Sequence, residues 1–212
     1  MSNQSAPQLL KKLVGDTPMD VTQLFLMRYD VLYNFYLAGI WDTIPQDLMR
    51  QRPHPRVNSI AWILWHLTRV EDAGLNRFVM DGSQVLDEGD WMRRMKVPWR
   101  HNGSEMTLAG VDDLSLRIDL NALREYSQAV QVRTREILAN IDQVNLEATL
   151  QEPYIRKVIV EEGLGYTDPE GFIQNYTGWS KGKCLMTYGL THPFQHLGEI
   201  ETIASLLGVV FE

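Results

Sequence analysis

The sequence predicts an all-α protein built as a four-helix bundle. Apolar side chains recur every three to four residues in four separate stretches, which is the period of a helix with one buried face. Two connections, residues 81–118 and 143–186, are much longer than neighbouring antiparallel helices need. The best strand-like run is residues 157–160, Lys-Val-Ile-Val, and so we expect no extensive sheet.

The first two helices follow from their apolar stripes and from start and stop signals. Residues 20–38 carry one such stripe. A second helix is predicted to begin near Asn58 and Ser59, whose side-chain oxygens can accept hydrogen bonds from the first free backbone amides. Asp81-Gly82 is the predicted end of that helix.

The last two helices are predicted over residues 119–142 and about 190–207. Gly208 stands where a residue following a helix end is commonly glycine. The start of the last helix is open, because Pro193 suits a first turn and would kink a helix that began nearer Thr187.

The composition is that of a folded domain rather than of a nucleic-acid binder. The chain has 212 residues, 44% of them hydrophobic, and we expect one domain over residues 1–212 with the two long connections as insertions. Its 20 Lys and Arg against 27 Asp and Glu give a formal net charge of −7. Phosphate neutralisation needs a basic surface, so a nucleic-acid partner is disfavoured.

Cysteine usage and hydropathy bear on the compartment. Cys184 is the only cysteine, which excludes an intramolecular disulfide framework and favours a reducing cytoplasm. No apolar stretch has the length of a membrane span, and so we expect no membrane partner. Six tryptophans and nine methionines favour a homodimer, although composition alone leaves the oligomeric state open.

The most informative segment is THPFQHLGEIETIASLLG, where His192 and His196 lie four residues apart. On a helix the two imidazoles stand one above the other and can hold one metal ion together. The same rotation places Glu199 and Ile203 on that face, so the pair is directed toward the core. Buried imidazoles need a hydrogen-bond partner or a metal, because an unpaired buried polar group costs about 1–3 kcal/mol.

His66 adds a third imidazole, on the border of the apolar stripe of the second helix. A lone histidine at such a position is most often a hydrogen-bonded core residue. Three histidines from two helices, however, form a ligand set that Zn²⁺, Ni²⁺ or Fe²⁺ takes in catalytic sites, with positions left for water or substrate. The alternative that stays open is a metal-free bundle whose histidines only form hydrogen bonds.

These residues carry a resemblance to a known family. His66 within NSIAWILWHLTRVEDAGLNRF, together with His192 and His196, resembles the DinB/YfiT-like family of metal-dependent four-helix proteins. The resemblance spans nearly the whole chain and implies an up-down-down-up helix order, for which long crossovers are needed. It also implies that His66, His192 and His196 bind a divalent metal.

The resemblance further implies a function. Characterised members of that family are mostly thiol enzymes: bacillithiol S-transferases, a mycothiol-dependent maleylpyruvate isomerase and the metal domain of ergothioneine sulfoxide synthases. We therefore expect a thiol-dependent transferase or isomerase, or a hydrolase, in which Zn, Ni or Fe activates a low-molecular-weight thiol or water for a small-molecule substrate. The alternative is a stress-linked binding module that keeps a structural or vestigial metal.

Several further residues are weaker candidates. Glu199 is a candidate general base or a hydrogen-bond acceptor behind a ligand, with a carboxylate bonded to another helix as the alternative. Arg69 and Arg77 share the side of His66 and could meet a substrate carboxylate, although a solvated surface role is favoured. We expect Glu71 and Asp72 to face away from His66, and Trp62 to lie in the core or at the pocket wall. We expect His54 and His101 to be solvated and Cys184 to be inert. Tyr166, Tyr176 and Trp179 are expected to form a lid.

Overall fold

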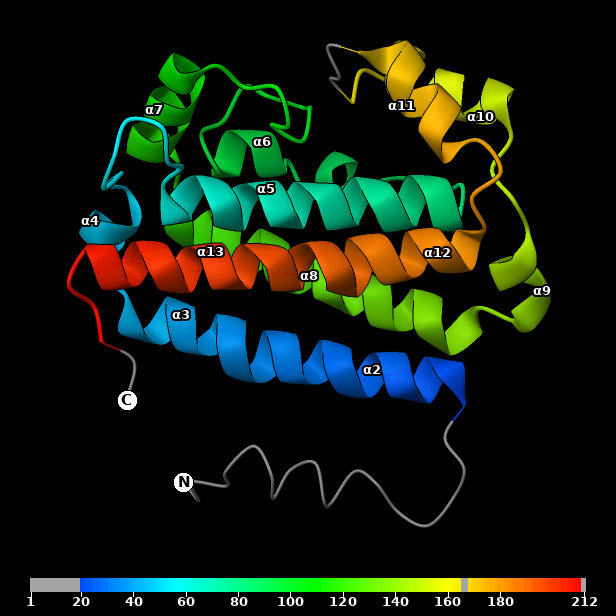
Figure 1. Ribbon diagram of the computed structural model, residues 1–212, viewed down its shortest axis with the longest axis horizontal. Helices are drawn as coiled ribbons and strands as arrows, with labels where there is room; N and C mark the ends of the chain where they lie inside the picture. Colours follow the sequence, from blue (N-terminus) through cyan, green and yellow to red (C-terminus); the bar gives the residue numbers. More distant parts are fainter. Residues whose placement is uncertain (1–19, 165–167, 211–212) are drawn as a thin grey trace.

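Four helical rods lie side by side in the computed structural model, which describes residues 20–164 and 168–210 (Figure 1). Three of the rods continue from an α-helix through a π-helical segment, and two of these then return to an α-helix. The rods are α2 (Val21–Val31), η1 (Leu32–Leu37) and α3 (Ala38–Thr43); α5 (Ile60–Ala73) and η2 (Gly74–Val79); α8 (Leu120–Asn140); and α12 (Lys181–Met186), η5 (Thr187–Thr191) and α13 (His192–Leu206).

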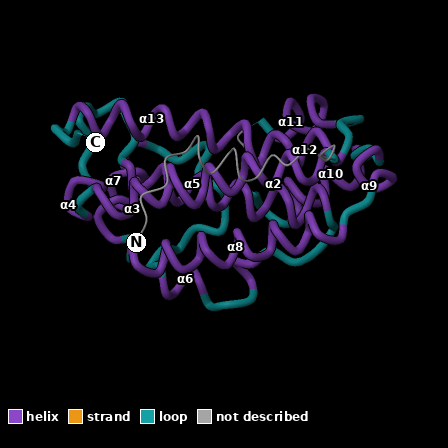
Figure 2. Tube along the Cα trace, turned by 90° about the horizontal axis from the view of Figure 1, so that it is seen from below, coloured by secondary structure: helices purple, strands orange, loops and turns teal. Residues whose placement is uncertain are grey.

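The rods have the up-down-down-up order. In Figure 1, α2 and α13 run in one direction, and α5 and α8 run in the other. The described part of the chain contains no β-strand (Figure 2), only an isolated antiparallel bridge between Thr149 and Ser180. The predicted all-α bundle is therefore confirmed. No helix of the described residues is both long enough and apolar enough to cross a membrane.

Short helices fill both long connections. A further short helix, α4 (Gln46–Met49), lies between the first and second rods. The connection between α5 and α8 contains η3 (Val85–Asp87), α6 (Trp91–Arg94) and α7 (Leu108–Arg117). The connection between α8 and α12 contains α9 (Gln143–Glu147), α10 (Glu152–Arg156), η4 (Lys157–Glu161) and α11 (Pro169–Tyr176).

The structure corrects the strand-like run at residues 157–160, because that run lies in η4 and is helical. Val158 and Ile159 are buried against the bundle while Lys157 and Val160 are exposed. Burial of two adjacent apolar side chains on a helix therefore outweighs the β-propensity of a short β-branched run.

The fourth rod begins at Lys181, nine residues before the predicted start. Ser180 caps it, since its hydroxyl accepts from the backbone N–H of Lys183. Pro193 is accommodated by the π-helical turn before it, in which the N–H of His192 donates to the carbonyl of Thr187, five residues back. In an unbroken α-helix the proline ring would collide with the carbonyl four residues earlier, and the wider turn relieves that collision.

Helix α5 lies at the centre of the molecule. All 14 of its residues are buried, including the charged Arg69, Glu71 and Asp72. The Asp72 carboxylate accepts from the backbone N–H groups of Val85 and Leu86, which fastens the connection after η2 to the helix. A helix that is buried all round holds its side chains rigidly, and it therefore supplies a firm base for His66.

Candidate metal centre

Three histidines from two rods meet at one point. His66 comes from α5, and His192 and His196 come from the first turns of α13. The Nε2 atom of His192 lies 3.2 Å from Nε2 of His66 and 3.1 Å from Nε2 of His196. The structure thus brings together all three of the predicted metal ligands.

Hydrogen bonds at the Nδ1 atoms of His66 and His196 fix which nitrogen of each ring carries the proton. Nδ1 of His66 lies 2.6 Å from the carbonyl oxygen of Asn102, and Nδ1 of His196 lies 2.8 Å from Oε2 of Glu199. A carbonyl or carboxylate oxygen only accepts, so each Nδ1 is the protonated donor. In a neutral imidazole the other nitrogen then carries a lone pair, and both Nε2 lone pairs are directed at the common point.

The spacing and the charge state both suit a divalent ion. At the usual metal–nitrogen distance, two imidazole nitrogens on one ion are about 3.0 Å apart in an octahedral site and about 3.4 Å apart in a tetrahedral one. Burial, helped by the neighbouring histidine His196, lowers the pKa of His66 to about 4, and burial lowers the pKa of His192 to about 3. Both rings are therefore neutral at pH 7, which is the form that binds metals.

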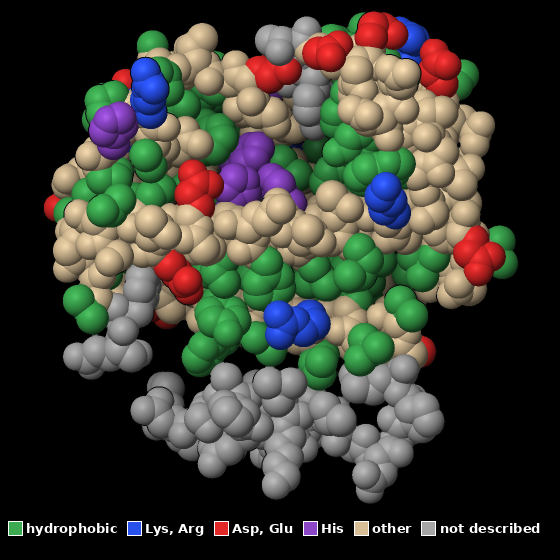
Figure 3. Space-filling view, in the orientation of Figure 1, with side chains coloured by type: hydrophobic (Ala, Val, Ile, Leu, Met, Phe, Trp, Pro, Cys, Tyr) green, Lys and Arg blue, Asp and Glu red, His purple; other side chains and the backbone are tan. Residues whose placement is uncertain are grey.

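One side of the cluster is open to solvent. His66 is buried, whereas His192 and His196 are only partly buried. Figure 3 shows the imidazoles at the bottom of a hollow on the face formed by α5 and α13. Trp62 packs against the cluster, because its indole stacks on the His66 ring with centroids 4.7 Å apart. A ligand can therefore approach the common point from the surface, while the protein holds the opposite side.

Asn102 also belongs to the three-histidine centre, and no feature of the sequence pointed to it. It lies in the connection between α6 and α7, and it acts through its backbone carbonyl. A main-chain acceptor has no residue-type signature, so only the fold could identify it. Glu199 was singled out from the sequence, and its carboxylate is seen to contact His196 rather than another helix.

The two predicted arginines are engaged elsewhere. Arg69 is fully buried, where it donates to Asp72, the Tyr126 hydroxyl, Gln84 Oε1 and the carbonyl of Arg100. The expectation of a solvated Arg69 was therefore wrong, because the connection 81–118 covers it. Arg77 is also largely buried, and it pairs with Glu162 and Asp81.

Glu71 and Asp72 do face away from His66, as expected. The Glu71 carboxylate accepts from the hydroxyls of Tyr29, Tyr33 and Thr134. Asp72 accepts from the Tyr126 hydroxyl and from Arg69.

The other histidines and Cys184 lie apart from the three-histidine cluster. His54 is exposed, as expected. His101 is half-buried rather than solvated, because its ring packs edge-on against Trp65 and its Nδ1 accepts from the N–H of Gly103. Cys184 is fully buried, and burial raises the pKa of its thiol to about 12, so that it stays protonated at neutral pH.

The predicted lid residues are described in part. Tyr166 lies outside the described residues. Tyr176 stacks between Phe172 and Trp179, with ring centroids 3.8 and 4.2 Å away, and it also faces Tyr188 of η5. Tyr176 and Trp179 therefore anchor α11 to the fourth rod, and the lid itself stays a prediction.

The comparisons with known proteins agree with this architecture. A crystal structure of a conserved protein from Enterococcus faecalis superposes with a TM-score of 0.67 at 15% sequence identity, over 90% of this chain and 99% of that one. At this identity the likeness shows the fold alone. No curated protein matches the chain significantly. The family model of the DinB superfamily matches residues 36–200, and the chain therefore belongs to the DinB superfamily.

Proposed function

We propose that the protein is a metal-dependent enzyme in which His66, His192 and His196 hold a divalent ion that activates a low-molecular-weight thiol or water. One observation carries the proposal: three Nε2 atoms converge, two of them with lone pairs fixed by hydrogen bonds at the far side of the ring, beneath a hollow open to solvent. A divalent ion bound there lowers the pKa of a coordinated thiol or water, which supplies a nucleophile near neutral pH.

The chain's own residues supply orientation. Asn102 and Glu199 keep His66 and His196 in the tautomer that presents Nε2 to the ion. Trp62 restrains the His66 ring by stacking on its face. Glu199 is therefore proposed as a positioning residue, because Oε2 is already occupied by His196. Zn²⁺, Ni²⁺ and Fe²⁺ all suit three imidazoles, so geometry alone does not select among them.

The open hollow favours a catalytic over a purely structural ion. Structural zinc sites are usually closed by four protein ligands, whereas catalytic sites keep a position for water or substrate. Here three ligands converge, and the side toward solvent is partly exposed. The reaction class we propose is transfer or isomerisation with a thiol cosubstrate, acting on a small electrophilic molecule.

Metal content measured by mass spectrometry on tag-free protein tests the proposal. We expect about one divalent ion per chain in the wild type and loss of that ion in His66→Ala. The matched control is His54→Ala, the same substitution at an exposed histidine outside the cluster, which should keep the ion. Full metal occupancy in His66→Ala or His196→Ala would contradict the site.

Activity is tested separately from binding. Metal-loaded wild type is assayed with a panel of thiols and electrophiles, and turnover should require both the metal and the thiol. A stoichiometric ion without turnover on any pair would support the binding-module alternative.

A further inference from the structure

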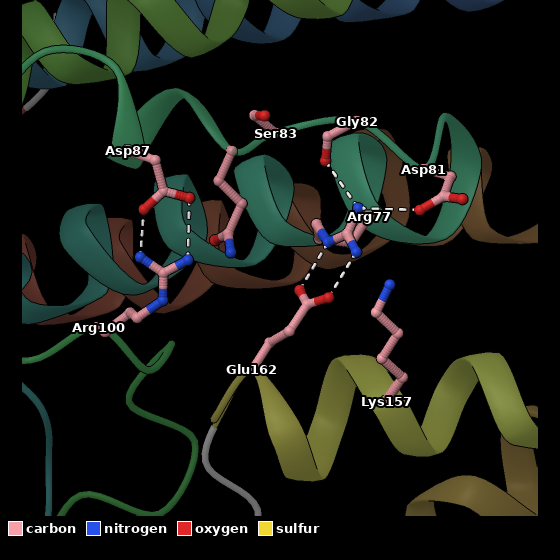
Figure 4. A pocket seen from close by; sticks show the side chains of 9 residues that line it. Arg77, Asp81, Gly82, Ser83, Asp87, Arg100, Lys157 and Glu162 are labelled. Atoms are coloured by element: carbon pink, nitrogen blue, oxygen red, sulfur yellow. Dashed lines mark hydrogen bonds and ion pairs between the residues drawn. The ribbon is translucent and has the colours of Figure 1, made fainter.

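A second cavity borders η2, the C-terminal segment of the second rod. It has a volume of about 410 Å³ and is bounded by η2, the loop that follows it, Arg100 and η4. Figure 4 shows its walls held by three ion pairs: Arg77 with Glu162, Arg77 with Asp81, and Arg100 with Asp87. None of the residues that line it belongs to the three-histidine centre, and the proposed function does not use it.

The carboxylates of this cavity already have partners. Glu162 accepts from Arg77 with both oxygens, at 2.6 and 2.7 Å. Asp87 accepts from Arg100 with both of its oxygens. Asp81 accepts from Arg77 at 3.1 Å and from the Tyr154 hydroxyl at 2.9 Å. Each of these three carboxylates therefore already accepts hydrogen bonds from a guanidinium group.

The groups left over are hydrogen-bond donors. Gln84 is 1% exposed, and its Nε2 has no hydrogen-bond partner within the part of the chain that the structure describes. Its orientation is fixed, because Oε1 accepts from Arg69 at 2.7 Å and Nε2 must then face away from that guanidinium. A buried donor without a partner is uncommon in native proteins and calls for an explanation.

Lys157 supplies the second donor. Its side chain is exposed on η4 and lines the cavity, and no ion pair or hydrogen bond of its ammonium is found among the described residues. In Figure 4 no dashed line joins it to another drawn side chain, although it extends from η4 toward the Arg77 wall. Gln84 and Lys157 therefore line one cavity from different walls, with the Gln84 donor buried and the Lys157 ammonium exposed.

From the unpaired Gln84 amide and the unpaired Lys157 ammonium in this cavity, we propose a binding site for the carboxylate group of a small polar molecule. The ligand must accept hydrogen bonds from these two groups, because the Gln84 NH₂ and the Lys157 ammonium only donate and the cavity's acidic groups are already paired. The lining carries three cations (Arg77, Arg100, Lys157) and three carboxylates (Asp81, Asp87, Glu162), so its formal charge is zero. A neutral lining accepts a monoanion more readily than a phosphate carrying about −2.

The test follows the side-chain amide signal of Gln84 by nuclear magnetic resonance during titration with sodium lactate, a small hydroxy-carboxylate. We expect a saturable shift in the millimolar range, and at least fivefold weaker binding in Lys157→Gln. Lys183→Gln is the matched control, because this exposed lysine does not line the cavity, and it should bind as the wild type does. Gln84→Glu keeps an oxygen for Arg69 but removes the donor, and binding should be lost.

A carboxylate could also reach the proposed metal, and so the titration is repeated in His66→Ala protein. Persistence of the Gln84 shift there separates this cavity from the metal centre. No saturable shift with lactate, equal binding in Lys157→Gln and wild type, or a shift with inorganic phosphate but not with lactate would each overturn the proposal. If Gln84→Glu fails to fold, the Lys157→Gln comparison alone decides.

Discussion

Nδ1 of His196 lies 2.8 Å from Oε2 of Glu199, one helical turn further along α13. The pair belongs to a single helix, so the carboxylate orients the imidazole without help from any other part of the fold. His66 obtains the same restraint from a distant loop, through the carbonyl of Asn102. A hydrogen bond at Nδ1 therefore directs Nε2 of each of these two histidines to the common point, from the same helix for His196 and from a distant loop for His66.

Glu199→Ala should lower the affinity for the metal by about 10–100-fold, as loss of a hydrogen-bond partner behind a ligand typically does. Glu199→Gln keeps an acceptor oxygen and should lose less. Competition of the protein with a chelator for Zn²⁺ measures both effects. Glu201→Gln, at an exposed position on the same helix, is the control and should match the wild type. Unchanged affinity in Glu199→Ala would mean that the carboxylate does not support the ligand.

Metal should stabilise the fold by mass action. An ion that binds only the folded chain, at a free concentration 100 times its dissociation constant, raises the free energy of unfolding by about 2.7 kcal/mol. Chemical denaturation of chelator-treated protein with and without added Zn²⁺ measures this difference. The same difference is expected in His54→Ala and should vanish in His192→Ala. An equal gain in His192→Ala would place the ion elsewhere.

Glu71 should make stability depend on pH. Burial raises the pKa of its carboxyl from 4.5 to about 7, against the lowering effect of its three hydroxyl donors. Because the folded state binds this proton more tightly, the stabilising contribution is complete below pH 4.5 and is lost as the pH rises through about 7. Over that interval the wild type should lose roughly 3 kcal/mol relative to Glu71→Gln.

Urea denaturation of the two proteins between pH 4.5 and 7.5 tests the role of Glu71. Effects of the histidines cancel in the difference, since both chains contain them. A difference that stays constant with pH would show that Glu71 has the same pKa in the folded and unfolded chains.

Gly74 and Gly198 should respond oppositely to alanine. A Cβ at Gly74 would lie 2.4 Å from Cγ of Tyr188, at the root of the ring where the side chain cannot move aside, so we expect a loss of about 1–3 kcal/mol. A Cβ at Gly198 meets nothing within 4 Å, and alanine there should add up to about 1 kcal/mol through helix propensity. Denaturation of metal-free protein measures both, and similar stabilities for the two variants would contradict the close approach of η2 and η5.

Local sequence was sufficient for the bundle and for the three histidines. Four stretches with a helical apolar period correspond to the four rods. A four-residue spacing places His192 and His196 on one helix face whatever their surroundings. The burial of Arg69 could not be predicted in this way, because its partners, Tyr126 and Gln84, come from other elements. The contact of the Asn102 carbonyl with His66 could not be predicted for the same reason.

The start of the fourth rod was misplaced for a different physical reason. Two glycines and a proline between residues 181 and 193 are local signals for a loop. The chain nevertheless stays helical there, because a π-helical turn accommodates Pro193 and because Gly182 and Gly189 leave room for Leu146 and Phe25. Packing between rods therefore decides a boundary that propensity alone would place later.

The π-helical turn η5 also sets the phase of the helix that carries the metal ligands. A π-turn holds one residue more than an α-turn, and each residue of a helix advances the side-chain direction by about 100°. The half that bears His192 and His196 is thus rotated relative to the half that bears Cys184 and Leu185, and each half can face its own neighbours. A chain one residue shorter within Thr187–Thr191 would keep both histidines in its sequence, yet turn them by about 100° relative to α12.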